Sequence, residues 1–290
     1  MKRISHYLSL IKFSHTVFAL PFALVGFTLA IKSSYMPEVT TALVATKLSL
    51  VVLCMVFARS AAMAFNRYLD RKFDAMNPRT AKREIPAGII SPQKALTFTI
   101  ANCVLFVACT WFINILCFYL SFVALFVILF YSYTKRITSL CHLVLGLGLS
   151  LAPLGAFLAV TGIFNLLPIL FSVVVLTWVS GFDIIYALQD EEFDKSQDLH
   201  SIPAALGTKY ALLVSTLLHI VTGSLVLFIG WYGGFNFIYW VGATAFIGLL
   251  TYQHLLVKPT DLSKVGIAFA NTNGFASILF ALFTIVSKFI

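Results

Sequence analysis

Two short segments of the chain carry acidic side chains at helical spacing, in a sequence that is otherwise poor in charge. Nine of the 11 acidic residues fall within residues 66–84 and 183–198. Residues three or four apart lie on one face of an α-helix, so each segment predicts an acidic stripe. The first stripe consists of Asn66, Asp70 and Asp74, and the second of Asp183, Tyr186, Asp190 and Asp194.

Two carboxylate stripes that face each other repel unless cations lie between them. Mg²⁺ prefers hard oxygen ligands and is commonly held by one or two carboxylates together with substrate phosphates. Arg79 and Arg83 follow the first stripe, and Lys135 lies in a later loop. Metal ions and basic side chains together can hold a diphosphate and stabilise it as a leaving group. The pattern therefore predicts Mg²⁺-dependent chemistry on a diphosphate.

The elements that position these residues must be membrane helices. The chain has 290 residues, of which 60% are hydrophobic and 11% charged, and its mean hydropathy is +0.95. These values exclude a disordered chain, a nucleic-acid-binding module and an ordinary soluble enzyme. Nine apolar runs are each long enough to span a bilayer as a helix. They cover residues 13–31, 46–68, 95–113, 115–134, 139–160, 166–188, 209–231, 235–257 and 265–287. The prediction is an all-α integral membrane bundle of nine transmembrane helices, in a single domain over residues 1–290.

Basic residues mark one side of this predicted bundle. Lys2, Arg3 and Lys12 precede the first run, and further lysines and arginines gather in alternate loops. Such loops are retained in the cytoplasm. The N-terminus is therefore predicted to be cytoplasmic, and both stripes lie at cytoplasmic helix ends of a multi-pass protein of the inner (plasma) membrane. The net charge of +9 then reports topology, and no nucleic-acid partner is implied.

One arginine lies inside an apolar run. Arg59 is two turns before Asn66 in the second run. A charged residue at membrane depth indicates a functional site by default, although a snorkelling or structural arginine is the alternative. A transporter is the rival class of function, because transporters also hold polar sites within the membrane. The clustering of acids near the cytoplasmic helix ends favours an enzyme.

At these residues the chain resembles the UbiA superfamily of intramembrane prenyltransferases. That family carries an NxxxDxxxD motif on its second helix and a DxxYxxxDxxxD motif on its sixth, and both are complete here. Residues 77–80 and 83–88 are similar to the loop after the first motif in bacterial 4-hydroxybenzoate polyprenyltransferases. The resemblance covers the whole chain and implies a nine-helix bundle with its active site toward the cytoplasm.

The resemblance also implies roles for individual residues. Two Mg²⁺ ions are expected on the diphosphate of a polyprenyl donor, and their ligands would be Asn66, Asp70, Asp74, Asp183, Asp190 and Asp194. The expected diphosphate-binding residues are Arg79, Arg83, Lys135, Tyr131 and Lys195. Arg59 would bind the acceptor's carboxylate, which suits a guanidinium. The catalytic residues would be Asp183, Tyr186 and Asp190, with Asp183 or Asp190 as the base.

The implied reaction transfers a polyprenyl group from the diphosphate to the ring of a small aromatic acid, such as 4-hydroxybenzoate, in respiratory quinone biosynthesis. The donor's tail would lie along an apolar groove that is open to membrane lipid. Arg83-Glu84-Ile85-Pro86 replaces the Arg-Pro-Leu that is typical of proteobacterial hydroxybenzoate enzymes. This form is similar to a wider bacterial group that includes proposed enzymes of the futalosine route to menaquinone. A dihydroxynaphthoate is therefore the alternative acceptor.

Overall fold

Helices occupy the apolar runs in the computed structural model, which describes residues 2–11, 18–35 and 40–290. Seven helical stretches among these residues are long and apolar enough to cross a membrane. They are Thr41–Leu69, Pro92–Ile113, Ile115–Thr134, Cys141–Thr161, Leu166–Ser196, Ile202–Tyr232 and Ile267–Val286. The all-α, multi-pass architecture expected from the sequence is confirmed.

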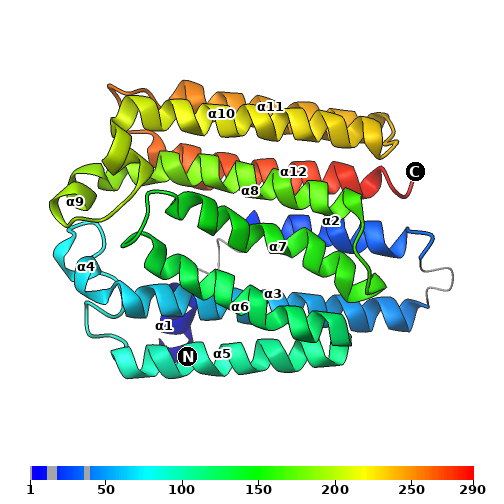
Figure 1. The fold of residues 1–290 in the computed structure, drawn as a ribbon, viewed down its shortest axis with the longest axis horizontal. Helices are drawn as coiled ribbons and strands as arrows, with labels where there is room; N and C mark the ends of the chain where they lie inside the picture. Colours follow the sequence, from blue (N-terminus) through cyan, green and yellow to red (C-terminus); the bar gives the residue numbers. More distant parts are fainter. Residues whose placement is uncertain (1, 12–17, 36–39) are drawn as a thin grey trace.

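The remaining two apolar runs also form helices. α2 (Leu20–Ile31) and α11 (Phe237–Leu256) lie alongside the other long helices (Figure 1). The start of the first run, residues 13–17, lies outside the described residues, as does Lys12. α11 includes the polar Gln253 and His254 near its end, which lowers its hydropathy. The count of nine spans and their orientation therefore stay predictions.

The other elements follow the chain in the order of Figure 1. They are α1 (Lys2–Leu10), α3 (Thr41–Leu69), α4 (Arg71–Met76), α5 (Pro92–Ile113), α6 (Ile115–Thr134), α7 (Cys141–Thr161), α8 (Leu166–Ala187), the 3₁₀ turn η2 (Leu188–Asp190), α9 (Glu191–Ser196), α10 (Ile202–Tyr232), the π-helical η3 (Ile267–Thr272) and α12 (Asn273–Val286). Polar side chains begin several of these helices by accepting a backbone N–H, as Ser91 does for α5 and Ser201 for α10. These caps satisfy amide groups that have no partner within the helix.

Small residues let α7 approach its neighbours closely. A Cβ on Gly26 of α2 would lie 2.0 Å from the carbonyl oxygen of Pro153 in α7. A Cβ on Gly146 of α7 would lie 2.5 Å from the carbonyl oxygen of Leu176 in α8. Helices in a membrane associate through such close packing, since lipid provides no hydrophobic drive between them. Close packing against α2 and α8 thereby fixes the position of α7, and with it the position of the loop after Lys135 that leads into α7.

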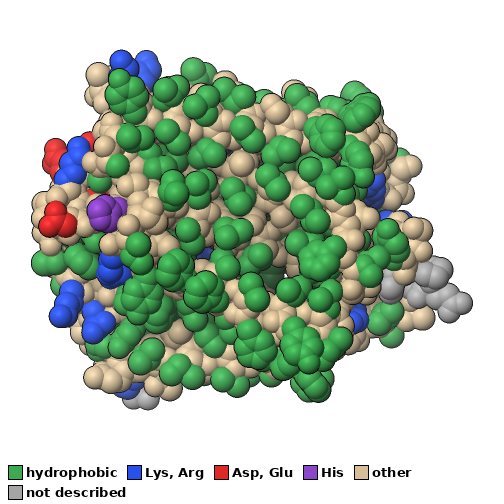
Figure 2. Space-filling view, viewed as in Figure 1, with side chains coloured by type: hydrophobic (Ala, Val, Ile, Leu, Met, Phe, Trp, Pro, Cys, Tyr) green, Lys and Arg blue, Asp and Glu red, His purple; other side chains and the backbone are tan. Residues whose placement is uncertain are grey.

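The surface has an apolar middle, and the acidic side chains visible in Figure 2 lie at one end of it. Hydrophobic side chains cover the middle of the face in Figure 2, and the acidic side chains visible there gather at the end where α4 and α9 lie. Exposed large side chains include Phe112, Tyr119, Phe126 and Trp231. This distribution fits lipid around the long helices and a polar site at one end.

Both acidic stripes coincide with interruptions of their helices. α3 ends at Leu69, and Asp70 is the residue between α3 and α4. α8 ends at Ala187, and Asp190 closes the 3₁₀ turn η2 before α9. The expectation of one unbroken helical face per stripe is therefore wrong. The acid at each break pairs with a base from another segment, Asp70 with Arg136 and Asp190 with Arg79.

Candidate active site

Asp70 stands at the centre of the first stripe. The Nδ2 of Asn66 donates to its Oδ2 at 2.9 Å, as the i,i+4 spacing predicts. Arg136, in the loop after α6, donates to its Oδ1 at 2.6 Å. Burial raises the pKa of the Asp70 carboxyl, and the charge of Arg136 opposes that rise. A further cation beside Asp70 would favour its ionised form.

Asp74 is the most enclosed acid of the first stripe. Asp74 is 6% exposed, and the Nη1 of Arg83 lies 2.6 Å from its Oδ1. The hydroxyl of Thr80 donates to the Asp74 carbonyl at 3.0 Å and fixes the returning loop. Within the described part of the chain, the buried Oδ2 of Asp74 has no hydrogen-bond partner. A buried carboxylate oxygen without a donor is costly, so this atom is a candidate position for contact with a bound cation.

Asp190 joins the second stripe to the loop after the first. Arg79 donates to both carboxylate oxygens of Asp190, through Nε at 3.0 Å and through Nη2. Asn77 donates to Oδ1 at 3.1 Å. Burial opposes the charged form of Arg79, but its bonds to Asp190 outweigh burial and hold the pKa of Arg79 above its ordinary value. Segments more than 100 residues apart in sequence thus meet at one carboxylate.

Tyr186 lies on the other side of the same arginine. Its hydroxyl accepts from the Nη1 of Arg79 at 2.8 Å, and its ring stacks on Phe269 of η3 at 4.1 Å between centroids. Arg79 is therefore held by two residues of the DxxYxxxDxxxD motif. The tyrosine of that motif orients the guanidinium in this arrangement.

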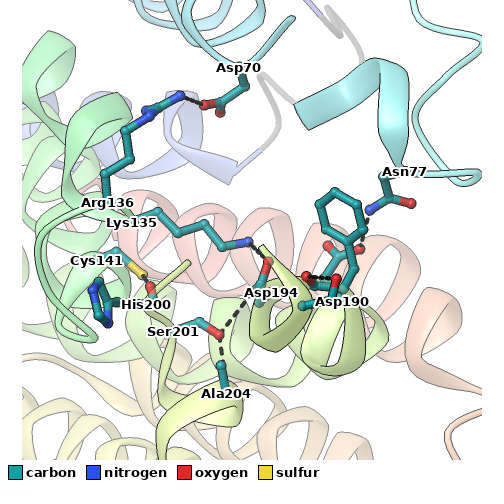
Figure 3. Close-up of polar contacts among 12 residues, drawn as sticks. Asp70, Asn77, Lys135, Arg136, Cys141, Asp190, Asp194, His200, Ser201 and Ala204 are labelled. Carbon is teal, nitrogen blue, oxygen red and sulfur yellow. Dashed lines mark hydrogen bonds and ion pairs between the residues drawn. The ribbon is translucent and has the colours of Figure 1, made fainter. Parts of the chain in front are cut away.

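Asp194 is fully buried and has two partners. The Nζ of Lys135 lies 2.7 Å from its Oδ1, and the hydroxyl of Ser201 donates to its Oδ2 at 2.9 Å. Figure 3 shows Lys135 and Arg136 extending from one loop, Lys135 toward Asp194 and Arg136 toward Asp70. The loop between α6 and α7 therefore contacts both stripes.

Asp183, the first acid of the second stripe, contacts a histidine. The Nδ1 of His142, in the first turn of α7, lies 2.7 Å from the Oδ2 of Asp183. The His142 side chain is 3% exposed, whereas the Asp183 side chain is 18% exposed. The Oδ2 of Asp183 thus has a buried hydrogen-bond partner, while the Asp183 side chain stays partly exposed.

Three further predicted residues lie outside these pairs. Tyr131 is on α6, close enough to Asp70 and Asp183 to interact with their charges. Lys195 pairs with Glu191 at 2.6 Å, an i,i+4 contact on α9 that directs it along the helix surface. Arg59 lies two turns before Asn66 within α3, and its Nε is fully buried. The structure brings Tyr131 to the acids and holds Lys195 on a neighbouring acid.

Sequence reasoning missed three residues of the site. Arg136 lies in the same loop as Lys135 and is also basic, but the sequence contains no signal that it turns to the other stripe. Asn77 precedes Arg79 by two residues and shares its acid. His142 is an isolated histidine at the start of an apolar run, which resembles a packing residue. The signal that the sequence offers for such residues is a polar side chain next to the end of a membrane helix.

The acids pair almost one for one with bases. Within the described residues, four ion pairs join an acid of the stripes to an arginine or a lysine: Asp70–Arg136, Asp74–Arg83, Asp190–Arg79 and Asp194–Lys135. Among the described residues, no three acidic, histidine or cysteine side chains converge as a ready-made metal cluster. The donor set nevertheless fits Mg²⁺, because it consists of carboxylate and amide oxygens and includes the orphaned Oδ2 of Asp74. The same acids and bases could bind Mg²⁺ and a diphosphate by exchanging partners.

Comparisons with known proteins agree with this site. The model of the UbiA prenyltransferase family matches residues 19–282. A 4-hydroxybenzoate octaprenyltransferase from Tolumonas auensis is 32% identical over 77% of this chain and 78% of its own length. The apo structure of a UbiA homolog from Aeropyrum pernix K1 is 31% identical, with a TM-score of 0.82 over 94% of this chain and 97% of the homolog.

A more distant structure shares the fold. A UbiA homolog from Archaeoglobus fulgidus bound to DMAPP and Mg²⁺ has a TM-score of 0.70 at 21% identity, over 94% of this chain and 98% of that one. The helical bundle, the two complete acidic motifs and the family match leave no support for a transporter. The chain belongs to the UbiA prenyltransferase family.

Proposed function

We propose that this protein is a Mg²⁺-dependent aromatic polyprenyltransferase of respiratory quinone biosynthesis. It would transfer a polyprenyl group from a polyprenyl diphosphate to the ring of a small aromatic acid such as 4-hydroxybenzoate. The observation that carries the proposal is the interlocking of the two stripes, in which Arg79 and Lys135 contact acids of the second stripe at one end of a membrane bundle. The similarity to 4-hydroxybenzoate octaprenyltransferases supports the acceptor class.

The residues that would hold two Mg²⁺ ions are the six oxygen donors of the stripes. They are Asn66, Asp70, Asp74, Asp183, Asp190 and Asp194. Bound Mg²⁺ would supply positive charge that stabilises the departing diphosphate. Arg79, Arg83, Lys135 and Arg136 would be released from their acids and would turn to the phosphate oxygens, with Tyr131 nearby. Lys195 would contribute only after leaving Glu191.

The reaction balances as an electrophilic substitution. The bond from C1 of the prenyl chain to the diphosphate oxygen breaks, and its electron pair leaves with the diphosphate. A new bond joins C1 to the ring carbon beside the acceptor's phenol, and the ring proton passes to a base. Asp183 or Asp190 would be that base. Arg59, deeper along α3, would bind the acceptor's carboxylate.

The acceptor has one alternative on the same chemistry. A dihydroxynaphthoate of the futalosine menaquinone route also offers an activated ring carbon and a carboxylate. The proposed site faces the cytoplasm, because the basic loops of the sequence lie on the side of the stripes, and the membrane of the proposal is the inner (plasma) membrane. The donor's tail would follow the apolar helix surfaces into the lipid.

The test uses purified protein in lipid nanodiscs with a radiolabelled prenyl diphosphate. 4-Hydroxybenzoate and dihydroxynaphthoates are supplied side by side, and products are identified by mass spectrometry. We expect a prenylated acid that forms with Mg²⁺ and is lost with EDTA. Asp70→Asn and Asp183→Asn should abolish turnover, whereas Glu192→Gln, an exposed acid of the same region, should retain it. Product without a divalent cation, or full turnover by both aspartate variants, would refute the proposal.

A further inference from the structure

His142 connects the two ends of the second acidic stripe. Its Nδ1 lies 2.7 Å from Asp183, and its Nε2 lies 3.3 Å from the backbone nitrogen of Ile202. Ile202 follows Ser201, whose hydroxyl donates to Asp194 at 2.9 Å. One imidazole therefore lies between the first acid of the stripe and the segment that holds its last acid.

The hydrogen bonds around the ring define its tautomer. A backbone N–H can only donate, so the Nε2 of His142 accepts from Ile202 and carries no proton. The Nδ1 then carries the ring proton and donates it to the Oδ2 of Asp183. Both nitrogens are used, and the ring cannot rotate without losing two buried bonds. His142 thus holds the Asp183 carboxylate in one orientation.

The surrounding contacts restrict the ring further. The hydroxyl of Ser180, one turn before Asp183, donates to the carbonyl of His142 at 3.1 Å. The backbone nitrogen of His200 donates to the carbonyl of Lys135 at 2.7 Å, which ties the loop before α7 to the loop before α10. Within the described residues, the hydrogen bond to Asp183 from His142 falls on Oδ2. The other oxygen, Oδ1, remains for the substrates while Oδ2 is occupied.

We propose that His142 is a positioning residue for prenyl transfer, which holds Asp183 so that its Oδ1 faces the reacting groups. The inference rests on the proposed function. The ring acts through a carboxylate, as the outer partners of metal-site ligands do, and their removal typically costs about 10- to 100-fold in affinity or activity. An apolar residue of similar volume could fill the space but could not orient Asp183.

The test compares two amide side chains at this position. The shorter amide introduced by His142→Asn can place an N–H where the Nδ1–H lies, whereas the longer side chain introduced by His142→Gln presents its amide nearer the place of Nε2. We expect His142→Gln and His142→Ala to lower kcat about 10- to 100-fold, to raise the Mg²⁺ concentration for half-maximal rate, and to leave the KM for prenyl diphosphate within about threefold. His142→Asn should recover kcat to within about fivefold of the wild type, on the same reasoning.

Two controls keep the outcome decisive. His200→Ala removes an exposed histidine of the neighbouring loop and should leave kcat unchanged. In an Asp183→Asn background, His142→Gln should not weaken Mg²⁺ binding further, as measured by calorimetry, because the carboxylate that His142 positions is already gone. Equal kcat for His142→Asn and His142→Gln, or an unchanged Mg²⁺ requirement, overturns the inference even if His142→Ala fails to fold. A wild-type protein that prenylates no aromatic acid refutes the proposed function instead.

Discussion

Lys135 and Arg136 are neighbours in the chain, yet their side chains end on different acidic motifs. Lys135 lies 2.7 Å from Asp194, and Arg136 lies 2.6 Å from Asp70. The loop between α6 and α7 therefore sets the position of one stripe relative to the other. A change in this loop should affect both stripes together.

Arg136→Gln tests this coupling. The substitution leaves Asp70 with a neutral partner and removes a positive charge that the proposed diphosphate would use. We expect the KM for prenyl diphosphate to rise about tenfold, the equivalent of about 1.4 kcal/mol, with partial recovery in Arg136→Lys. Steady-state kinetics with varied donor measure the effect. A donor KM unchanged in Arg136→Gln would mean that Arg136 is only a structural partner of Asp70.

Substitutions of Arg79 test whether its two parallel hydrogen bonds to Asp190 are needed. Lysine can keep one charge contact with Asp190 but not the two parallel bonds, nor the bond to Tyr186. Because bidentate contacts add both energy and geometry, we expect kcat/KM to fall about 10-fold in Arg79→Lys and about 100-fold in Arg79→Ala. Steady-state kinetics of the two variants measure the difference. Full activity in Arg79→Lys would show that charge alone suffices at this position.

Metal and diphosphate should bind with positive coupling. Each of the four paired carboxylates that would take Mg²⁺ now holds a base, and each base is one that would take diphosphate. Adding either ligand alone breaks ion pairs, whereas adding both restores charge balance. We expect inorganic diphosphate to tighten Mn²⁺ binding, followed by electron paramagnetic resonance, at least about fivefold, and Mn²⁺ to tighten diphosphate binding by the same factor. Independent binding of the two ligands would contradict the partner exchange.

Arg59 should affect the acceptor and not the donor. It lies deeper along α3 than the ion pairs, where a guanidinium suits a carboxylate. We expect Arg59→Gln to raise the acceptor KM about 10-fold or more, as the loss of a charged hydrogen bond does, with the donor KM unchanged. The wild type should prefer acceptors with a carboxylate over phenols that lack one. This preference should be weaker in Arg59→Gln. A donor-specific defect would instead assign Arg59 to the diphosphate.

The contact between α2 and α7 should resist enlargement. Because a Cβ at Gly26 would lie 2.0 Å from a backbone oxygen that has little freedom to move, Gly26→Ala should cost about 1–3 kcal/mol of stability. At Gly248 of α11 a Cβ meets nothing within 4 Å, so Gly248→Ala is the matched control and should be neutral or slightly stabilising. Thermal unfolding in the same detergent compares them, and equal melting temperatures would contradict the close crossing.

The features that sequence predicts here are those encoded by local pattern. Apolar runs define the helices because each must satisfy its backbone within lipid, and the i,i+4 spacing correctly places Asn66 beside Asp70. The breaks at Asp70 and Asp190 are not predictable, since nothing in either segment resembles a helix terminator. They coincide with tertiary pairing to Arg136 and Arg79.

Which base pairs with which acid cannot be predicted from the sequence, for the same reason. The sequence places Lys195 at the diphosphate, but Glu191 lies one turn before it and competes locally. His142 escapes prediction because a lone histidine in an apolar run carries no periodic signal. Its two hydrogen-bond partners belong to α8 and α10, which only the folded bundle brings together.

The order of the ion pairs along the chain bears on how the protein is made. Asp74 pairs with a residue 9 positions away and Asp70 with one 66 positions away, so both can be neutralised before α8 is synthesised. Arg79 must wait for Asp190, 111 residues later, and Lys135 for Asp194. Until then both are unpaired cations that would retain their loops on the cytoplasmic side during insertion. The same two charges would thus orient the first half of the nascent chain and later close the site on the second half.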